Sequence, residues 1–237
     1  MDRLYVVMPA YNEEETIRSV VEEWYPVLDG KPDASRLLIA DSGSSDQTHV
    51  ILENLQKTYP KLEILSNTKR QHGPKVIALY DYAVKNHADY IFQTDSDGQT
   101  DAAEFEGFWE LRKQYDAVLG YRTARGDGRS RAWVERVVCF LLWVFFGVKV
   151  PDANAPFRLM KSAAVKKYLG RLPKDYDLPN IMMTAYFARF QENIVFKQIT
   201  FKPRRGGVNS IDLQRIVKIG WKALGDFRQF RKGMGRA

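Results

Sequence analysis

Apolar runs and helical patterns alternate along the first half of the chain. Short apolar runs with the length of strands occur at 4–8, 36–40, 62–65, 90–93 and 116–119. Segments with helical spacing lie between them, at 13–28, 46–58, 74–87 and 101–114. Because strand–helix alternation favours parallel strands joined by right-handed crossovers, the pattern predicts an α/β fold with a doubly wound, mostly parallel sheet and helices on both faces.

The second half is less regular. It predicts helices at 130–147, 162–169, 178–190 and 211–231, and a strand at 193–202. The last helix is amphipathic, with Leu213, Ile216, Val217, Gly220, Leu224 and Phe227 on one face and Arg215, Lys218 and Lys222 opposite. It either packs on the body with a solvated basic face or docks on a membrane surface. With no repeat and no obvious linker, 1–237 is expected to be a single domain.

An uncharged apolar run extends from Val137 to Val148. It is shorter than the roughly 20 residues that a spanning helix needs. A buried core helix and a helix in the membrane interface both fit it. The chain starts with a polar pair and a β-like run rather than a signal peptide, and Cys139 is its only cysteine, so we expect a reducing, cytoplasmic location.

Charge is distributed unevenly along the 237 residues. The formal net charge is +7, yet 197–237 alone carries 11 Lys and Arg against Asp212 and Asp226, a local +9. A basic segment on a nearly neutral body indicates a polyanionic partner, such as a phosphate, an anionic lipid headgroup or a nucleic acid. A surface that is charged only for solubility is the alternative.

Polar clusters follow three of the predicted strands. They occupy 9–13 after the first strand, 41–48 after the second and 95–99 after the fourth. In open parallel sheets ligands bind at the carboxyl ends of the strands. The sequence therefore predicts that the three clusters share one pocket.

Asp95 and Asp97 are the most informative of these residues. Alternating carboxylates at a strand end, with Gln99 nearby, offer oxygen ligands to one hard cation such as Mg²⁺ or Mn²⁺. Such an ion would neutralise the charge that develops on a leaving diphosphate. Loop capping is the alternative role for an Asp-x-Asp pair.

Three further acids lie in the first two clusters. Asp41, at the end of the second strand, is placed to bond a base or a ribose. Asp46 is a natural N-cap for a helix that starts at Gln47. Glu13 is either a ligand contact or a first-turn acid favoured by the helix dipole.

Together these clusters resemble family 2 glycosyltransferases of the A-type nucleotide-sugar fold. Residues 6–13 resemble the family's opening strand with Pro-x-Tyr-Asn-Glu, and 41–48 resemble its Asp-Asp-Gly-Ser-x-Asp-x-Thr segment. Residues 95–99 resemble the Asp-x-Asp-x-Gln metal motif of polyprenyl-phosphate sugar synthases. The resemblance continues through 120–122, 152–158 and 204–210 and so covers most of the chain.

The resemblance implies roles for individual residues. The nucleoside would be held by Pro9, Tyr11, Glu13 and Asp41, the metal by Asp95, Asp97 and Gln99, and the phosphates by Arg122, Arg131 and Arg204. It further implies that 1–120 binds the nucleotide-sugar and 121–237 the acceptor and the membrane. Ser42 stands where the second Asp is usual, and Asn154-Ala155-Pro156 replaces the commoner Thr-Ser-Gly.

The acceptor is expected to be a polyprenyl (dolichyl or undecaprenyl) phosphate. Five arginines between Arg122 and Arg136, next to the apolar run, suit a lipid phosphate at an anionic membrane surface. An ionised phosphate needs no strong base, and Asp152 is the only candidate base that the sequence offers. We therefore expect a metal-dependent, inverting, peripheral membrane enzyme in which Asp97, Asp152 and Arg122 are catalytic.

Two alternatives remain open at this point. The enzyme could instead act on a sugar hydroxyl of a glycan or a lipid-linked oligosaccharide, with Asp152 as base. A nucleic-acid-binding protein is disfavoured, since no helix-turn-helix or zinc spacing is evident. No Gly-x-Gly-x-x-Gly or Walker sequence supports use of a dinucleotide or ATP.

Overall fold

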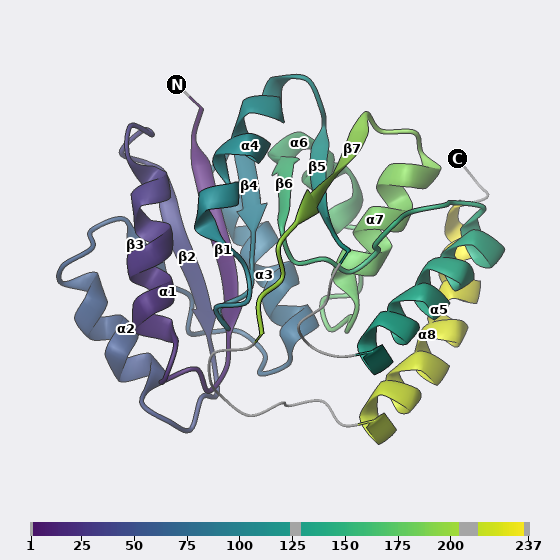
Figure 1. Cartoon of the computed structure of the whole chain (residues 1–237), viewed down its shortest axis with the longest axis horizontal. Coiled ribbons are helices and arrows are strands. Elements are labelled where there is room, and N and C mark those ends of the chain that lie inside the picture. Colours follow the sequence, from purple (N-terminus) through teal and green to yellow (C-terminus); the bar gives the residue numbers. More distant parts are fainter. Residues whose placement is uncertain (1, 124–128, 204–212, 235–237) are drawn as a thin grey trace.

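The computed structural model describes residues 2–123, 129–203 and 213–234, and the side chains of 129–132, 213–221 and 234 lie outside what it describes. Its described strands form one seven-stranded sheet of order β3-β2-β1-β4-β6-β5-β7 (Figure 1). They are β1 (Leu4–Ala10), β2 (Arg36–Asp41), β3 (Leu62–Ile64), β4 (Tyr90–Gln93), β5 (Ala117–Arg122), β6 (Arg158–Lys161) and β7 (Ile194–Ile199). Strand β6 runs antiparallel to β4 and β5, and the other pairs are parallel. The mostly parallel sheet predicted from the sequence is confirmed.

The strand that the sequence did not predict is β6. It has only 4 residues, and it opens on Arg158, which is fully buried. A buried arginine in a short strand gives no apolar alternation, so no periodic signal marks it. Its antiparallel insertion between β4 and β5 is a property of the tertiary structure alone.

The described helices are α1 (Ile17–Trp24), α2 (Thr48–Gln56), α3 (His72–Lys85), α4 (Glu106–Trp109), α5 (Arg129–Phe146), α6 (Ser162–Leu169), α7 (Pro179–Arg189) and α8 (Leu213–Met234), with 3₁₀ turns η1 (Tyr25–Leu28), η2 (Ala102–Glu104) and η3 (Glu110–Lys113). Two predicted helices differ from this. The first begins at Ile17 rather than at 13, and 101–114 is broken into η2, α4 and η3. Phe105, Phe108 and Trp109 of the broken segment all reach the core from about one turn, with Gly107, a poor helix former, between them.

The core has two layers, one on each face of the sheet. Tyr5 and Val7 of β1 point into the layer formed with α3, α6 and α7, whereas Val6 and Met8 point into the layer with α1, α2 and α4. This alternation follows from the two-residue period of a strand. Both faces of the central strands are therefore covered, and exposed polar side chains within a strand are found on the edge strand β7, at Lys197 and Gln198.

Helices α5 and α8 pack side by side at one end of the sheet (Figure 1). Phe227 of α8 is buried and lies 5.9 Å and 5.5 Å, between ring centroids, from Phe145 and Phe146 of α5. Lys222 of α8 forms a 2.7 Å ion pair with Asp177. Along its described side chains, the C-terminal helix therefore packs on the body.

The apolar run in helix α5 was expected to be either a buried core helix or a helix in the membrane interface, and the helix has both a buried side and an exposed apolar side. Leu142 and Phe146 are buried, and the opposite side exposes Trp133 (66%), Phe140 (57%), Trp143 (48%) and Val144 (47%). These four residues recur at helical spacing, so they form one strip, which we term the α5 ridge. No described helix combines the length and the apolar character that crossing a bilayer requires.

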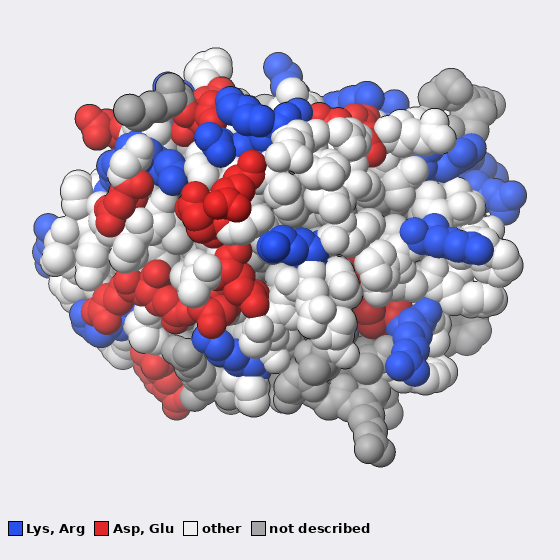
Figure 2. Space-filling view, turned by 45° about the horizontal axis from the view of Figure 1, so that its top comes forward, with Lys and Arg blue, Asp and Glu red and all other residues white. Residues whose placement is uncertain are grey.

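Figure 2 shows the charges on one face of the molecule. On this face acidic side chains gather over the half that contains β1, β2 and β3, with Lys and Arg side chains among them, whereas the other half shows a larger share of uncharged surface.

Candidate active site

The carboxyl ends of β1, β2 and β4 meet at one edge of the sheet, the lower edge in Figure 1. Ala10, the last residue of β1, pairs with Asp41, the last residue of β2. Past the end of β4, Ser96 Oγ donates a 2.9 Å hydrogen bond to Pro9 O. The three polar clusters after these strands therefore lie together, as the sequence predicted.

The first and second loops are held together by hydrogen bonds. Asn12 has a positive φ of 54°. Its backbone N–H donates to Ser44 Oγ at 3.0 Å, and its side-chain oxygen accepts from Ser45 N at 2.8 Å. Asn is one of the few residues that adopts this backbone region at low cost. Glu13 N donates to Thr48 Oγ1 at 2.8 Å, so the loops after β1 and β2 form a single wall of the site.

Glu13 lies before α1 rather than in its first turn. Its side chain is buried, and Thr16 Oγ1 donates to its Oε2 at 3.1 Å. The predicted first-turn role is therefore wrong for this helix, which begins at Ile17. A ligand contact by Glu13 stays a prediction.

Asp46 organises the start of α2. Its Oδ1 accepts from Thr48 N at 3.0 Å and from Thr48 Oγ1 at 2.6 Å. Partial burial raises the pKa of Asp46, but the hydrogen bonds from Thr48 and Glu14 outweigh it and lower the pKa. The predicted N-cap role of Asp46 is wrong, because α2 begins at Thr48 and its N-cap is Gln47; Asp46 instead bonds the first residue of the helix from the position before the cap.

Asp41 is buried at the bottom of this wall. Ser44 Oγ donates to its Oδ1 at 2.5 Å, and His49 Nδ1 lies 3.0 Å from its Oδ2. Both oxygens are thus oriented by neighbours from the second loop and from α2. The position at the strand end agrees with the predicted nucleoside contact, which stays a prediction.

Basic side chains from the start of α3 and the loop before it complete this end of the site. The guanidinium of Arg70 lies 4.6 Å from the Tyr11 ring centroid and donates to the Tyr11 hydroxyl. Lys75 is buried, and its Nζ donates to Ala10 O at 2.5 Å. Burial lowers the pKa of Lys75 to about 8, against the attraction of the nearby Asp41 carboxylate.

The sequence reasoning passed over Arg70, His72 and Lys75. The available signal was a basic segment, 69–75, between the third predicted strand and a predicted helix, at the same edge of the sheet.

The predicted metal ligands lie in the third loop. Asp97 Oδ1 accepts from Gln99 N at 3.2 Å, so the loop-capping role of this pair is present. The Gln99 side chain is buried and its Nε2 donates to Lys202 O at 2.8 Å. Asp95 Oδ1 lies 3.4 Å from His72 Nε2.

These residues fit a hard cation by their chemistry, since the carboxylates and the Gln99 side-chain oxygen are the donors that Mg²⁺ and Mn²⁺ take. Within the described ranges, no group of three or more His, Cys, Asp and Glu side chains is placed to hold a metal ion. The predicted set has only two carboxylates, and its role as a metal site stays a prediction.

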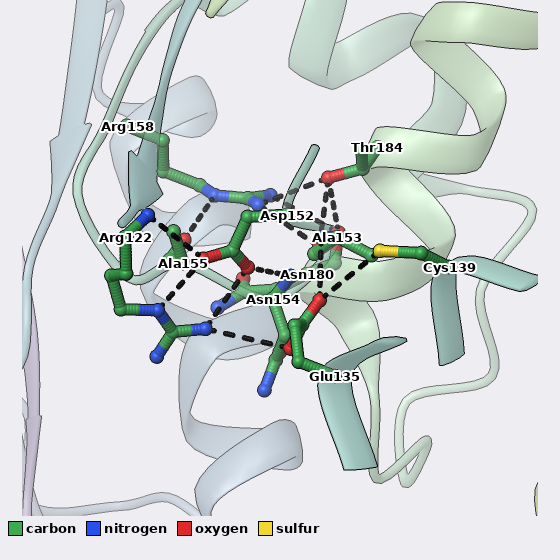
Figure 3. A network of polar contacts seen from close by, with 10 residues as sticks. All are labelled: Arg122, Glu135, Cys139, Asp152, Ala153, Asn154, Ala155, Arg158, Asn180 and Thr184. Carbon is green, nitrogen blue, oxygen red and sulfur yellow. Dashed lines mark hydrogen bonds and ion pairs between the residues drawn. The ribbon is translucent and has the colours of Figure 1, made fainter. Parts of the chain in front are cut away.

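A second polar network lies at the end of β5, shown in Figure 3. Arg122 Nε and Nη2 donate to the two oxygens of Asp152 at 2.7 Å and 2.9 Å, and both side chains are buried. Burial raises the pKa of Asp152, but the hydrogen bond and charge of Arg122 outweigh it and lower the pKa. A carboxylate with a lowered pKa is a weak base, and the role of Asp152 as catalytic base stays a prediction.

Glu135 of α5 joins this network. Its Oε1 accepts from Ala153 N at 2.7 Å, and its Oε2 lies 3.5 Å from Arg122 Nη2. Burial and the neighbouring Asp152 carboxylate raise the pKa of Glu135. The helix that carries the α5 ridge is therefore attached to the same loop, 151–157, as Asp152.

Arg158 fixes that loop from the other side (Figure 3). Its Nε donates to Ala155 O at 3.2 Å and its Nη2 to Thr184 Oγ1 at 3.0 Å, and burial lowers its pKa. Two other predicted phosphate ligands cannot be placed: the side chain of Arg131 and the whole of Arg204 lie outside the described residues.

A mostly parallel sheet with acidic loops at the carboxyl ends of its strands is the arrangement of an α/β protein that binds its ligand at that edge. Comparison with known families agrees with this class. The model of glycosyl transferase family 2 matches residues 5–169, and the chain belongs to that family.

Two curated relatives are similar over different lengths. The undecaprenyl-phosphate 4-deoxy-4-formamido-L-arabinose transferase of Pseudomonas aeruginosa (strain LESB58) is 24% identical over 220 residues, 92% of this chain and 63% of the relative. The dolichyl-phosphate beta-glucosyltransferase ALG5C of Trichomonas vaginalis is 27% identical over 134 residues, 54% of this chain and 38% of the relative. The chain thus spans less than two thirds of the length of both.

A solved structure confirms the predicted fold. Glucosyl-3-phosphoglycerate synthase from Mycobacterium tuberculosis, in complex with Mn²⁺, uridine-diphosphate-glucose and phosphoglyceric acid, superposes with a TM-score of 0.72. The match covers 98% of this chain and 80% of that one at 18% identity, a level at which the fold alone is shared.

Proposed function

We propose that this chain is a metal-dependent, inverting glycosyltransferase that moves a sugar from a nucleotide-diphosphate-sugar to a polyprenyl phosphate. The observation that carries the proposal is the meeting of Asp41, Asp95 and Asp97 at one sheet edge in a member of glycosyl transferase family 2. One domain performs both tasks: 1–120 binds the donor, and 121–237 binds the acceptor and the membrane.

The donor nucleoside lies against the wall formed by the first two loops. Pro9, Tyr11, Glu13 and Asp41 contact it, and the oriented Asp41 carboxylate accepts hydrogen bonds from a base or a ribose. The buried Lys75 adds a positive charge for the phosphates.

Asp95, Asp97 and Gln99 hold Mg²⁺ or Mn²⁺ when the ion is bound. The ion supplies positive charge to the diphosphate that leaves in the reaction. The curated relatives agree with a phosphate acceptor, because both are named as transferases that act on a polyprenyl phosphate.

A phosphate acceptor also suits the electrostatics at Asp152. An oxygen of an ionised phosphate attacks the anomeric carbon, while the bond from that carbon to the diphosphate breaks and the nucleoside diphosphate leaves with the electron pair. No proton has to be removed from such a nucleophile. The ion pair with Arg122, which lowers the pKa of Asp152, is then no obstacle to the reaction.

The acceptor is reached from an anionic membrane on its cytoplasmic face. The α5 ridge supplies aromatic side chains of the kind that lie at the membrane interface, and the basic segment 197–237 supplies the attraction to anionic lipids. Glu135 attaches this helix to the loop that contains Asp152, so the membrane-facing helix adjoins the site of transfer.

A direct assay tests the proposal. The protein is incubated with Mn²⁺, a panel of nucleotide-sugars and a short-chain polyprenyl phosphate, and the lipid fraction is analysed by mass spectrometry. A lipid-phospho-sugar with inverted anomeric configuration is expected. Transfer to sugar hydroxyls alone would reject the phosphate acceptor and favour a glycan or lipid-linked oligosaccharide as substrate.

A further inference from the structure

Residues 200–203, which follow β7 directly, connect the two halves of the candidate site. Strand β7 lies at the edge of the sheet, and β5 and β6 separate it from β4. From the end of β7 at Ile199 the chain runs toward the lower edge of the sheet in Figure 1, where it meets the loop after β4. We term 200–203 the exit segment. The function proposed above gives no role to its contacts.

On one side, the exit segment is bonded to Gln99 in the loop after β4. Lys202 N donates to Gln99 O at 2.7 Å, and Gln99 Nε2 donates back to Lys202 O at 2.8 Å. The ion pair between Lys202 Nζ and Asp101 Oδ2, at 2.7 Å, adds a third contact with the same loop. Because Gln99 N also donates to Asp97 Oδ1 at 3.2 Å, one residue joins the Asp97 carboxylate to the exit segment.

On the other side, the exit segment contacts Arg122 through Phe201. The Phe201 ring is buried, and its centroid lies 5.1 Å from the guanidinium of Arg122, the residue that pairs with Asp152. Phe201 and Lys202 are consecutive, and the Cα atoms of consecutive residues are only about 3.8 Å apart. A movement of the loop after β4 that displaces Lys202 therefore displaces Phe201 against Arg122 as well.

The buried amide of Gln99 is not explained by stability. Burying an amide costs free energy that its hydrogen bonds only offset, whereas an apolar side chain of the same length would fill the space without that cost. What the amide adds is direction, because its N–H fixes where Lys202 O lies relative to the loop after β4.

We propose that Gln99 is a positioning residue, which acts through Lys202 to hold the loop after β4 and the Arg122–Asp152 pair at a fixed distance from each other. The inference rests on the proposed function, in which that loop carries the donor diphosphate and that pair lies on the acceptor side. It uses the amide nitrogen of Gln99 and not the oxygen that the proposed function assigns to the ion. A donor that orders the loop then also orders the acceptor side, so the two substrates bind cooperatively.

Isothermal titration calorimetry with farnesyl phosphate, alone and at saturating UDP or GDP with Mn²⁺, measures this cooperativity. In the natural protein the nucleotide should tighten the binding of farnesyl phosphate roughly five- to thirtyfold. In Gln99→Met this factor should fall below about two, while the affinity for the nucleotide alone changes by less than about threefold. Gln198→Met is the matched control, because Gln198 Nε2 bonds Thr123 Oγ1 on the exposed part of β7, and it should keep the natural cooperativity.

Two further variants test the path of the effect. Gln99→Glu keeps a side-chain oxygen but has no N–H for Lys202 O, so it should lose the cooperativity as Gln99→Met does. Cooperativity that survives in Gln99→Glu and is lost in Gln99→Met would assign the effect to the oxygen and overturn the inference. Phe201→Leu, which removes the ring beside Arg122, should also lose the cooperativity while nucleotide affinity is kept.

Hydrogen exchange gives a readout that needs no substrate. The backbone amide of Lys202 should exchange roughly tenfold faster or more in Gln99→Met than in the natural protein, because its segment is no longer held by the Gln99 side chain. Circular dichroism shows whether each variant is folded. An unchanged exchange rate in a folded Gln99→Met would mean that the amide does not hold the exit segment.

The outcomes separate this inference from the proposed function. If the nucleotide and farnesyl phosphate bind without cooperativity, or if the cooperativity persists in Gln99→Met, the positioning role is overturned and the glycosyltransferase stands. If farnesyl phosphate does not bind under any of these conditions, the proposed phosphate acceptor is overturned, and this inference with it.

Discussion

His49 Nδ1 lies 3.0 Å from Asp41 Oδ2, and the two residues come from α2 and from the end of β2. Asp41 is almost fully buried, so the imidazole is one of the few groups that orient its carboxylate. The other oxygen accepts from Ser44 Oγ at 2.5 Å. A carboxylate that carries no proton only accepts hydrogen bonds, so in the tautomer that bonds it His49 Nδ1 is the donor.

This relationship predicts that His49 supports donor binding through Asp41. A hydrogen bond to a charged group contributes about 1.5–3 kcal/mol, so His49→Ala should weaken the binding of a nucleoside diphosphate roughly ten- to a hundredfold. Isothermal titration calorimetry with UDP and GDP measures this. His49→Asn, whose amide can donate from a similar position, should restore most of the affinity.

Glu53→Gln is the matched control, because Glu53 contacts His49 only at 3.7 Å from its Nε2. The affinity of Glu53→Gln for UDP and GDP should stay within about twofold of that of the natural protein. Equal nucleotide affinity in His49→Ala would show that the Asp41 carboxylate does not need this support.

The buried Lys75 predicts a pH dependence of donor binding. Its pKa is lowered to about 8 by burial, so its charge is lost as the pH rises through about 8 rather than through 10.5. A bound diphosphate favours the charged form and raises this pKa. Nucleotide binding near pH 8 should therefore take up protons, and the affinity should fall roughly three- to tenfold between pH 7 and 9.

Calorimetry in buffers of different ionisation enthalpy measures the proton uptake. Lys75→Gln should abolish both the uptake and the pH dependence. Lys85→Gln, at the exposed far end of α3, should leave both intact. Proton uptake that persists in Lys75→Gln would assign the titration to another group.

The proposed metal site predicts a strong effect of replacing Asp97. Because the ion is expected to carry much of the charge stabilisation of the leaving diphosphate, Asp97→Ala should lower kcat roughly a hundredfold or more. Excess chelator should do the same. Asp81→Ala, whose carboxylate pairs with Lys85 on α3, is the control and should retain its activity. Full turnover in chelator would defeat the assignment.

The buried Arg122–Asp152 pair predicts a loss of stability. Removing one partner of a buried ion pair costs about 3–5 kcal/mol, because the other charge stays buried and unbalanced. Asp152→Asn should therefore lower the free energy of unfolding in urea by roughly 2–4 kcal/mol. Since the pKa of Asp152 is lowered in the fold, its contribution is present above the unfolded value of 3.8 and is lost as the pH falls below it.

Asp152→Asn also distinguishes a phosphate acceptor from a sugar-hydroxyl acceptor. A severe loss of kcat with unchanged donor affinity would favour a hydroxyl acceptor that needs Asp152 as base. Glu135→Gln keeps the acceptor for Ala153 N and so controls for disturbance of the loop.

The α5 ridge predicts binding to membranes. Replacing Trp133, Phe140 and Trp143 by serine removes apolar surface that would be buried in the interface, and binding to vesicles with anionic lipid should fall at least tenfold, to judge from about 25 cal/mol for each Å² buried. Vesicle sedimentation measures it. Val50→Ser, on the exposed side of α2, is the matched control and should bind normally.

Anionic and neutral vesicles together distinguish the contributions. Binding of the natural protein should weaken on neutral lipid and at high salt, since the basic segment 197–237 acts by charge. Unchanged vesicle binding in the triple variant would place the membrane contact elsewhere on the molecule.

Several elements were predictable because their signal is local. The apolar runs that become β1, β2, β4 and β5 each contain enough buried residues in sequence to be recognised. The rule that ligands bind at the carboxyl ends of parallel strands then led from those runs to Asp41, Asp95 and Asp97. The spacing of apolar residues and the order of the strands can both be recognised from short stretches of consecutive residues.

Other features depend on contacts between distant segments, and only the tertiary structure decided them. Strand β6 is held by its pairing with β4 and β5, not by a pattern of its own. The pairing of His72 with Asp95, the burial of Lys75 under Ala10 and the capture of Asp152 by Arg122 each join residues more than twenty positions apart.

The sequence by itself determined the family, the layered α/β architecture and the edge of the sheet where the acids gather, because each of these follows from periodicity and residue order. The tertiary structure decided that Arg122 pairs with Asp152, that Lys75 is buried and that one face of α5 stays exposed. Those outcomes depend on burial and on distances of a few ångströms across the fold, and no local pattern encodes them.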